Sequence, residues 1–172
     1  MRFILIDRLV RIEPGKSVRA IKNLSLAEEY LGDHFPQFPV LPGVLMLEAM
    51  VQASAWLVRV SEDFQHSVIV LRQARNVSYG NFVAPGDTIT VETEAIKLEP
   101  QFSSFKTQCL MGGANVVRAR LDLEHYNLSD RRPHWAEQDE RLLDHFRRQF
   151  KLLSGFEAMA AQSASCKAEA NQ

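Results

Sequence analysis

Apolar and polar residues alternate along several stretches of the chain, which is the pattern of half-buried β-strands. Turn dipeptides separate these stretches, at Pro14-Gly15, Pro85-Gly86 and Gly112-Gly113. The alternation predicts two strands before a long apolar segment and four strands after it. The predicted ranges are residues 3–13, 17–24, 67–77, 87–98, 103–111 and 115–125.

The long apolar segment lies between the second and third predicted strands. Residues 43–60 are apolar on nearly every side of a helix, with Glu48, Gln52 and Arg59 among the polar exceptions. A helix that is apolar all round must be buried all round, and these polar residues make it a poor membrane span. The order of elements favours an α+β fold, in which an antiparallel β-sheet is wrapped around a central buried α-helix.

The last third of the chain has a different pattern. We expect one domain over residues 1–128, followed by a linker over 129–134 and a C-terminal helix over 135–153, where apolar residues recur at helical spacings. Residues 154–172 are rich in Ala, Ser and Gln, and this composition is typical of a disordered tail.

Composition adds few constraints. The 172 residues are enough for one domain with a core, and the formal net charge of −1 gives no reason to expect nucleic acid or a membrane as a partner. The two cysteines form no CxxC motif, and the first residues lack the apolar core of a signal peptide. We therefore expect a cytoplasmic protein.

Two residues in and before the apolar helix are candidates for chemistry. Glu48 is a carboxylate in an apolar helix, and Gln52 lies four residues later on the same face, where it can hydrogen-bond to Glu48. His34 begins a loop that Pro36, Pro39 and Pro42 make rigid. Taken singly, Glu48 and Gln52 could be a buried polar pair that fixes helix packing, and His34 could be a structural loop residue.

The start of the helix adds a third feature that favours a catalytic role for His34 and Glu48. Gly43 and Val44 lie where backbone N–H groups have no partner within the helix, and glycine leaves room for a ligand carbonyl. An imidazole, a carboxylate and a backbone donor are the groups needed to enolise a thioester and to expel a β-hydroxyl group.

This segment resembles a known family. The run His34-Phe-Pro-x-x-Pro-Val-x-Pro-Gly-Val-Leu-x-Leu-Glu-Ala-Met-x-Gln52 is similar to the signature of bacterial β-hydroxyacyl-(acyl-carrier-protein) dehydratases of fatty-acid synthesis. Three further runs resemble segments of that family in the same order, so that the resemblance covers about residues 3–125. These runs are Phe3-Ile-Leu-Ile-Asp-Arg8, Val18-Arg-Ala-Ile-Lys-Asn-Leu-Ser25 and Val83-Ala-Pro-Gly-Asp87.

The resemblance implies a hot-dog fold and a homodimer at minimum, often a hexamer built as a trimer of dimers. It implies an active site shared between subunits, in which His34 of one subunit takes the α-proton and Glu48 of the other protonates the leaving hydroxyl. The Gly43 N–H would hold the thioester oxygen beside Val44, with Gln52 in support. The substrate would be carried by acyl carrier protein, without any cofactor or metal. A related group that also isomerises the product has aspartate at the position of Glu48, so glutamate favours the plain dehydratase.

The chain departs from the family pattern in three places. Gln37-Phe38 replaces a small pair such as Gly-His, and Gly80-Asn81-Phe82 lacks the basic residues that help meet an acidic carrier protein. The helix over 135–153 is an addition, which we expect to cover an exposed sheet face rather than to cap an acyl tunnel or cross a dimer.

Two alternative functions follow from the same residues. One is a hot-dog enzyme that hydrates or hydrolyses CoA thioesters. The other is a non-catalytic paralogue that binds acyl chains or serves as a partner subunit, to which the departures above would point. The remaining histidines, His66, His125, His134 and His145, show no metal-ligand spacing and are expected to be solvated.

Overall fold

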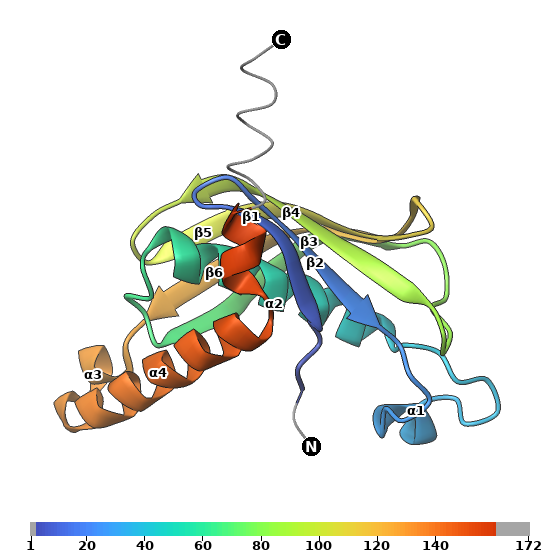
Figure 1. Ribbon diagram of the computed structural model, residues 1–172, viewed down its shortest axis with the longest axis horizontal. Helices are drawn as coiled ribbons and strands as arrows, with labels where there is room; N and C mark the ends of the chain where they lie inside the picture. The colour runs from blue at the N-terminus through green and yellow to red at the C-terminus, as the bar shows by residue number, and fades with distance from the viewer. Residues whose placement is uncertain (1–2, 161–172) are drawn as a thin grey trace, which may run out of the picture.

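Six strands form one antiparallel sheet that curves around a single long helix in the computed structural model, which describes residues 3–160 (Figure 1). The strand order is β1-β2-β4-β5-β6-β3, and each neighbouring pair is antiparallel. This arrangement confirms the predicted α+β architecture. The bounds are β1 Arg8–Glu13, β2 Ser17–Asn23, α1 Tyr30–Asp33, α2 Gly43–Ser61, β3 Val68–Tyr79, β4 Thr88–Leu98, β5 Phe102–Met111 and β6 Ala114–Tyr126.

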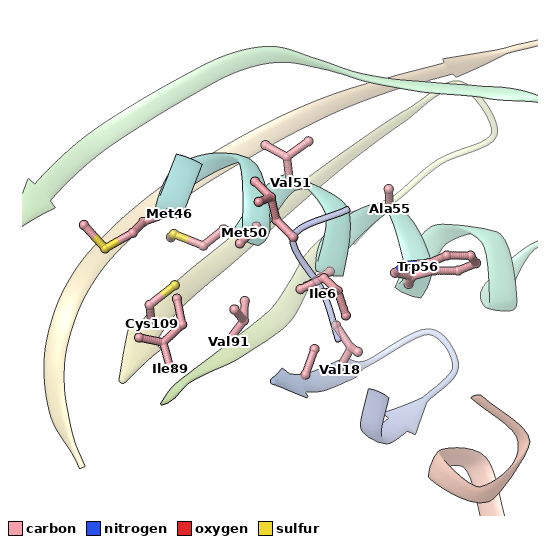
Figure 2. Packing of buried hydrophobic residues seen from close by; sticks show 14 of the residues in the cluster. Ile6, Val18, Met46, Met50, Val51, Ala55, Trp56, Ile89, Val91 and Cys109 are labelled. Carbon is pink, nitrogen blue, oxygen red and sulfur yellow. The ribbon is translucent and has the colours of Figure 1, made fainter. Parts of the chain in front are cut away.

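The core lies between helix α2 and the concave face of the sheet. Alternate residues of β2, β4, β5 and β6 are buried, so one face of each strand points at the helix. In Figure 2, Met46 and Met50 of α2 lie over Ile89, Val91 and Cys109 of the sheet. By length and composition α2 could span a membrane, but most of its apolar window is buried inside the protein. It is the central helix that the sequence predicts.

The first predicted strand is shorter than expected. Residues 3–7 are not in strand conformation, and β1 begins only at Arg8. Part of the backbone of this segment bonds to a helix side chain, and only the Asp7 N–H bonds to strand β2 among the described residues, at the Ile21 carbonyl. Gln52 Nε2 donates to the Phe3 carbonyl at 2.9 Å, and Gln52 Oε1 accepts from the Leu5 N–H at 2.9 Å. Leu5 and Ile6 of this apolar segment are buried in the core without forming part of a strand.

The segment expected to be a linker has regular structure. It contains the short helix α3, Leu128–Arg131, and a 3-10 turn, Pro133–Trp135, which leads into α4, Ala136–Leu152. The buried carboxylate of Asp139 in α4 accepts hydrogen bonds from the Leu128 N–H at 2.8 Å, from the Ser129 N–H at 2.9 Å and from the Ser67 hydroxyl. Burial alone would raise the pKa of Asp139, but these hydrogen bonds outweigh it, so the pKa is lowered. One carboxylate thus joins α3, α4 and the start of β3.

The C-terminal helix packs against α2, which corrects our expectation that it covers a sheet face. The ring of Phe150 lies 5.9 Å from that of Trp56 and 5.8 Å from that of Phe64, centroid to centroid. The tail is also more ordered than expected at its start, because residues 155–160 are helical and Ala158 is buried. Apolar contacts with the core hold this turn. The rest of the predicted tail, residues 161–172, lies outside the described residues.

The sheet ends in two different edges. The N-terminal strand β1 forms one edge and the 12-residue strand β3 forms the other. Most residues of β3 are exposed, including Val70, Leu71 and Tyr79. A long strand edge with unpaired backbone groups and exposed apolar side chains is a common place for pairing with another chain.

The Asp139 contacts give a stability prediction. A group whose pKa is lowered in the folded state stabilises the fold above its unfolded pKa, about 3.9 for aspartate. That contribution is lost as the pH falls through the folded pKa. We expect Asp139→Asn to lower the free energy of unfolding at pH 7 by about 1–3 kcal/mol, and to weaken the dependence of stability on pH in the acidic range. Urea unfolding at several pH values measures both.

Asp144→Asn is the matched control, because Asp144 is exposed on the same helix and forms a surface ion pair with Arg147, at 3.6 Å. It should change the unfolding free energy little. Equal losses in the two variants would show that Asp139 does not hold the C-terminal segment in place.

Candidate active site

A stripe of polar residues follows one face of the central helix. Glu48, Gln52 and Arg59 recur at intervals of four and seven residues, so their side chains lie above one another. Gln52 Nε2 donates to Glu48 Oε1 at 3.0 Å while Gln52 also holds the backbone of residues 3–5. The predicted pair of Glu48 and Gln52 is therefore in contact, and Gln52 restricts the orientation of the carboxylate.

The stripe faces a pocket of about 460 Å³. The floor comes from α2, one side comes from the N-terminal segment, and the far end comes from α4. The residues that line it are Phe3, Ile4, Glu48, Val51, Gln52, Ala55, Trp56, Arg59, Ile69, His145, Phe146 and Gln149. A larger hollow of about 680 Å³ lies over β3, β4, β5 and β6 and contains none of the predicted site residues. The smaller pocket is therefore the candidate active site, because it contains Glu48 and Gln52.

The start of α2 has free backbone donors. The Leu45 and Met46 N–H groups both bond to the Pro42 carbonyl, whereas the Gly43 and Val44 N–H groups have no acceptor among the described residues. A Cβ on Gly43 would lie 2.9 Å from Cε1 of Tyr79. The space that glycine leaves is thus bordered by the Tyr79 ring.

His34 does not reach this pocket within one chain. It follows α1 directly, its ring lies 4.4 Å from that of Phe35, and it is absent from the residues that line the pocket. In Figure 1, α1 and the loop after it lie at one end of the molecule and α4 lies at the other. A single chain therefore brings Glu48 and Gln52 together, with Gly43 and Val44 on the same helix, but leaves His34 apart.

Two departures from the family pattern meet in space. Phe38, in the loop after His34, and Phe82, before β4, have ring centroids 5.6 Å apart in an edge-to-face arrangement. Both rings are exposed, as are Phe35 and Val44 nearby in the chain. The loop that bears His34 is thus braced by an aromatic contact that replaces the small and basic residues of the pattern.

Arg59 at the far end of the pocket is the least expected member of the stripe. It is buried, and no carboxylate within the described residues pairs with it. Its guanidinium carbon lies 3.8 Å from the ring centroid of Phe146 and 5.2 Å from that of Trp56. Burial lowers the pKa of Arg59 to about 9, so the side chain still carries its charge at neutral pH.

One group of described residues could hold a metal ion, and it lies outside this pocket. Glu62 Oε2 lies 2.7 Å from Nδ1 of His66, and Glu62 Oε1 lies 3.3 Å from Nδ1 of His125. His125 is fully buried and bonds to Ser103 Oγ at 2.9 Å, so our expectation that it is solvated is wrong. Burial alone would raise the pKa of Glu62, but the two histidines lower it. The structure therefore contradicts our expectation that these histidines have no metal-ligand spacing.

Comparison with known proteins places the chain in a family. The model of the FabA-like domain matches residues 1–120. A 3-hydroxyacyl-(acyl-carrier-protein) dehydratase FabZ of Clostridium kluyveri is 41% identical over 119 residues, which cover 69% of this chain and 83% of that protein. The FabZ protein of Wolbachia pipientis wMel is 41% identical over 90 residues, 52% of this chain and 63% of the relative. The match to the FabA-like domain includes the segment from His34 to Gln52.

Solved structures show the fold. The chain matches a structure described as the dehydratase heterocomplex ApeI:P from Xenorhabdus doucetiae with a TM-score of 0.63 at 20% identity, over 74% of this chain and 86% of that one. The match confirms the hot-dog fold, a curved antiparallel sheet around a central helix. Together with the family match over most of the chain, it leads to one conclusion: this protein belongs to the FabA-like family, as its central motif predicts.

Proposed function

We propose that the chain dehydrates a 3-hydroxyacyl thioester to the trans-2-enoyl thioester, with the acyl chain in the pocket beside Glu48. The main support is the geometry of α2, which offers a carboxylate and two backbone donors from one buried helix. The FabZ relatives are dehydratases named for acyl-carrier-protein substrates. We therefore propose that an acyl carrier protein delivers the substrate, and that the reaction serves fatty-acid or related acyl synthesis in the cytoplasm.

The chemistry needs an acid and a base on opposite sides of one carbon–carbon bond. In the proposed reaction His34 removes the α-proton, and the electron pair left behind forms the new double bond. The hydroxyl group leaves from the β-carbon with a proton from Glu48, directly or through water. Proton exchange with solvent returns both groups to their starting states. Neither step calls for a cofactor.

The N-terminus of α2 supports the enolate-like charge. The thioester oxygen would accept the unpaired Gly43 N–H, with the Val44 N–H beside it, at the positive end of a 19-residue helix. Donors aimed at a developing negative charge lower the barrier more than they stabilise the bound substrate. Gln52 acts on the reaction indirectly, because it orients Glu48.

The separation of His34 from the pocket supports a shared site in a homodimer. The exposed β3 edge offers a surface on which two copies can pair, and the exposed apolar residues of the His34 loop would be covered in such a pair. Two dyad-related sites would then each contain His34 of one copy and Glu48 of the other. A trimer of such dimers would be a hexamer.

A second function deserves a test. Phe38 and Phe82 stand where other members have small or basic residues that help bind an acidic carrier protein. Without those residues, the chain could act on CoA thioesters instead. It could also be a non-catalytic subunit that pairs with an active partner. Assays with carrier-linked and CoA-linked substrates separate these possibilities.

The first prediction concerns the acid–base pair. We expect His34→Ala and Glu48→Gln each to lower kcat by at least ~10²-fold, because general acid–base catalysis contributes about 10²–10⁴-fold. Enoyl formation from a carrier-linked 3-hydroxyacyl substrate, followed by ultraviolet absorbance or mass spectrometry, measures the loss. His134→Ala and Glu140→Gln, both exposed, are the matched controls. Full activity in either site variant would exclude the assigned roles.

The second prediction concerns the shared site. Subunits with His34→Ala and subunits with Glu48→Gln, refolded together, should regain activity. A hybrid dimer carries both changes in one site and neither in the other, so random pairing restores about a quarter of the wild-type rate in a two-fold symmetric dimer. No recovery in hybrids whose formation is confirmed by native mass spectrometry would place both groups in one chain.

A further inference from the structure

We propose that the far end of the pocket is an anion subsite, in which Arg59 binds a carboxylate at the distal end of the acyl chain. That the ligand is an acyl thioester rests on the proposed function. That the ligand carries a negative charge at this end rests on Arg59 alone. The ligand class is thus a 3-hydroxyacyl thioester whose other end is acidic, rather than one that ends in a methyl group.

The first argument is the cost of the charge. A buried guanidinium without a partner is unfavourable, and proteins normally pair such groups. Within residues 3–160 no carboxylate forms an ion pair with Arg59, and its Nε has no hydrogen-bond partner. Glu48 lies in the same pocket but eleven residues earlier, about 16 Å along the helix axis, which is too far for an ion pair.

The second argument is the position of the guanidinium. Its central carbon lies over the ring of Phe146, 3.8 Å from the ring centroid, and 5.2 Å from the ring centroid of Trp56. Aromatic faces bind the flat surface of a guanidinium, and the N–H groups at its edge stay available for a planar carboxylate. His145 lines the same end of the pocket and offers a further donor.

The third argument is the sequence of surfaces along the pocket. Glu48 and Gln52 form the reactive end, and Val51, Ala55 and Ile69 provide an apolar middle. The cation follows at the far end, where α4 closes the space with Phe146 and Gln149. Such a pocket matches a ligand with a thioester at one end, methylene groups between, and a negative charge at the other end.

The added helix α4 gains a role from this arrangement. Its residues His145, Phe146 and Gln149 form the end wall, so the C-terminal addition would determine which acyl chains fit. Our reading of the sequence considered a tunnel cap but favoured a sheet cover, because it had no sign that Arg59 and Phe146 meet.

The test compares two sets of 3-hydroxyacyl N-acetylcysteamine thioesters of matched length, one ending in a methyl group and one in a carboxylate. We expect wild-type kcat/KM to favour the carboxylate at its best length by ~10-fold to ~100-fold, the range for a hydrogen bond to a charged group. Arg59→Met, which keeps an apolar stem against Phe146, should remove that preference, and Arg59→Lys should retain part of it. Arg147→Met, on an exposed residue of α4, should leave it intact.

A binding measurement separates this proposal from the proposed function. Calorimetry compares the mono-methyl ester of an α,ω-dicarboxylic acid, which keeps one carboxylate, with the dimethyl ester, which has none. Both are measured for wild type and for Arg59→Met, after thermal unfolding has shown that the variant is folded. Tighter binding of the mono-methyl ester by wild type alone supports the subsite even where no thioester is dehydrated. Equal binding of both ligands by wild type, or an unchanged preference in Arg59→Met, overturns it whether or not the enzyme is active.

Discussion

The structure depends on the need to cover one helix on every side. Helix α2 is apolar nearly all round, and an exposed helix of that kind would leave a large apolar surface in water. The curved sheet covers most of it, and the N-terminal segment and α4 cover part of the rest. Ser54 faces the sheet and contacts Thr93, whereas the larger polar side chains Glu48, Gln52 and Arg59 line the pocket. The same constraint that forms the core thus gathers Glu48, Gln52 and Arg59 in one pocket.

Gln52 connects this core to the proposed chemistry. Its amide group satisfies the Leu5 N–H and the Phe3 carbonyl, and also donates to Glu48. Because every buried polar group of the backbone needs a partner, the N-terminal segment can leave the sheet only where a side chain replaces strand bonds. The carboxylate is therefore held by a residue that the fold also needs, and its position follows from the packing of residues 3–5.

Sequence periodicity predicted the parts of the fold that depend on neighbouring residues. The central helix and five of the strand regions follow from apolar spacing alone, and the long motif around His34 and Gly43 identified the family. Contacts between residues that are distant in the sequence could not be predicted from apolar spacing. The fully buried His125 meets Glu62 across the core, and Asp139 caps α3 from the next helix, because charged and histidine side chains look solvated until their partners are known.

The positions of His34 and Glu48 show that residues of one sequence motif need not lie close together in the folded chain. They lie fourteen residues apart in one continuous signature, yet His34 directly follows α1, which lies at the end of the molecule opposite α4. Three prolines fix the backbone of the loop after His34. Folding this rigid loop back over Glu48 of the same chain would therefore be unfavourable. The same stiffness would suit a loop that presents His34 to another copy. The Phe38–Phe82 contact adds a second brace to this loop, so bulkier residues at these positions are compatible with a loop that keeps its direction.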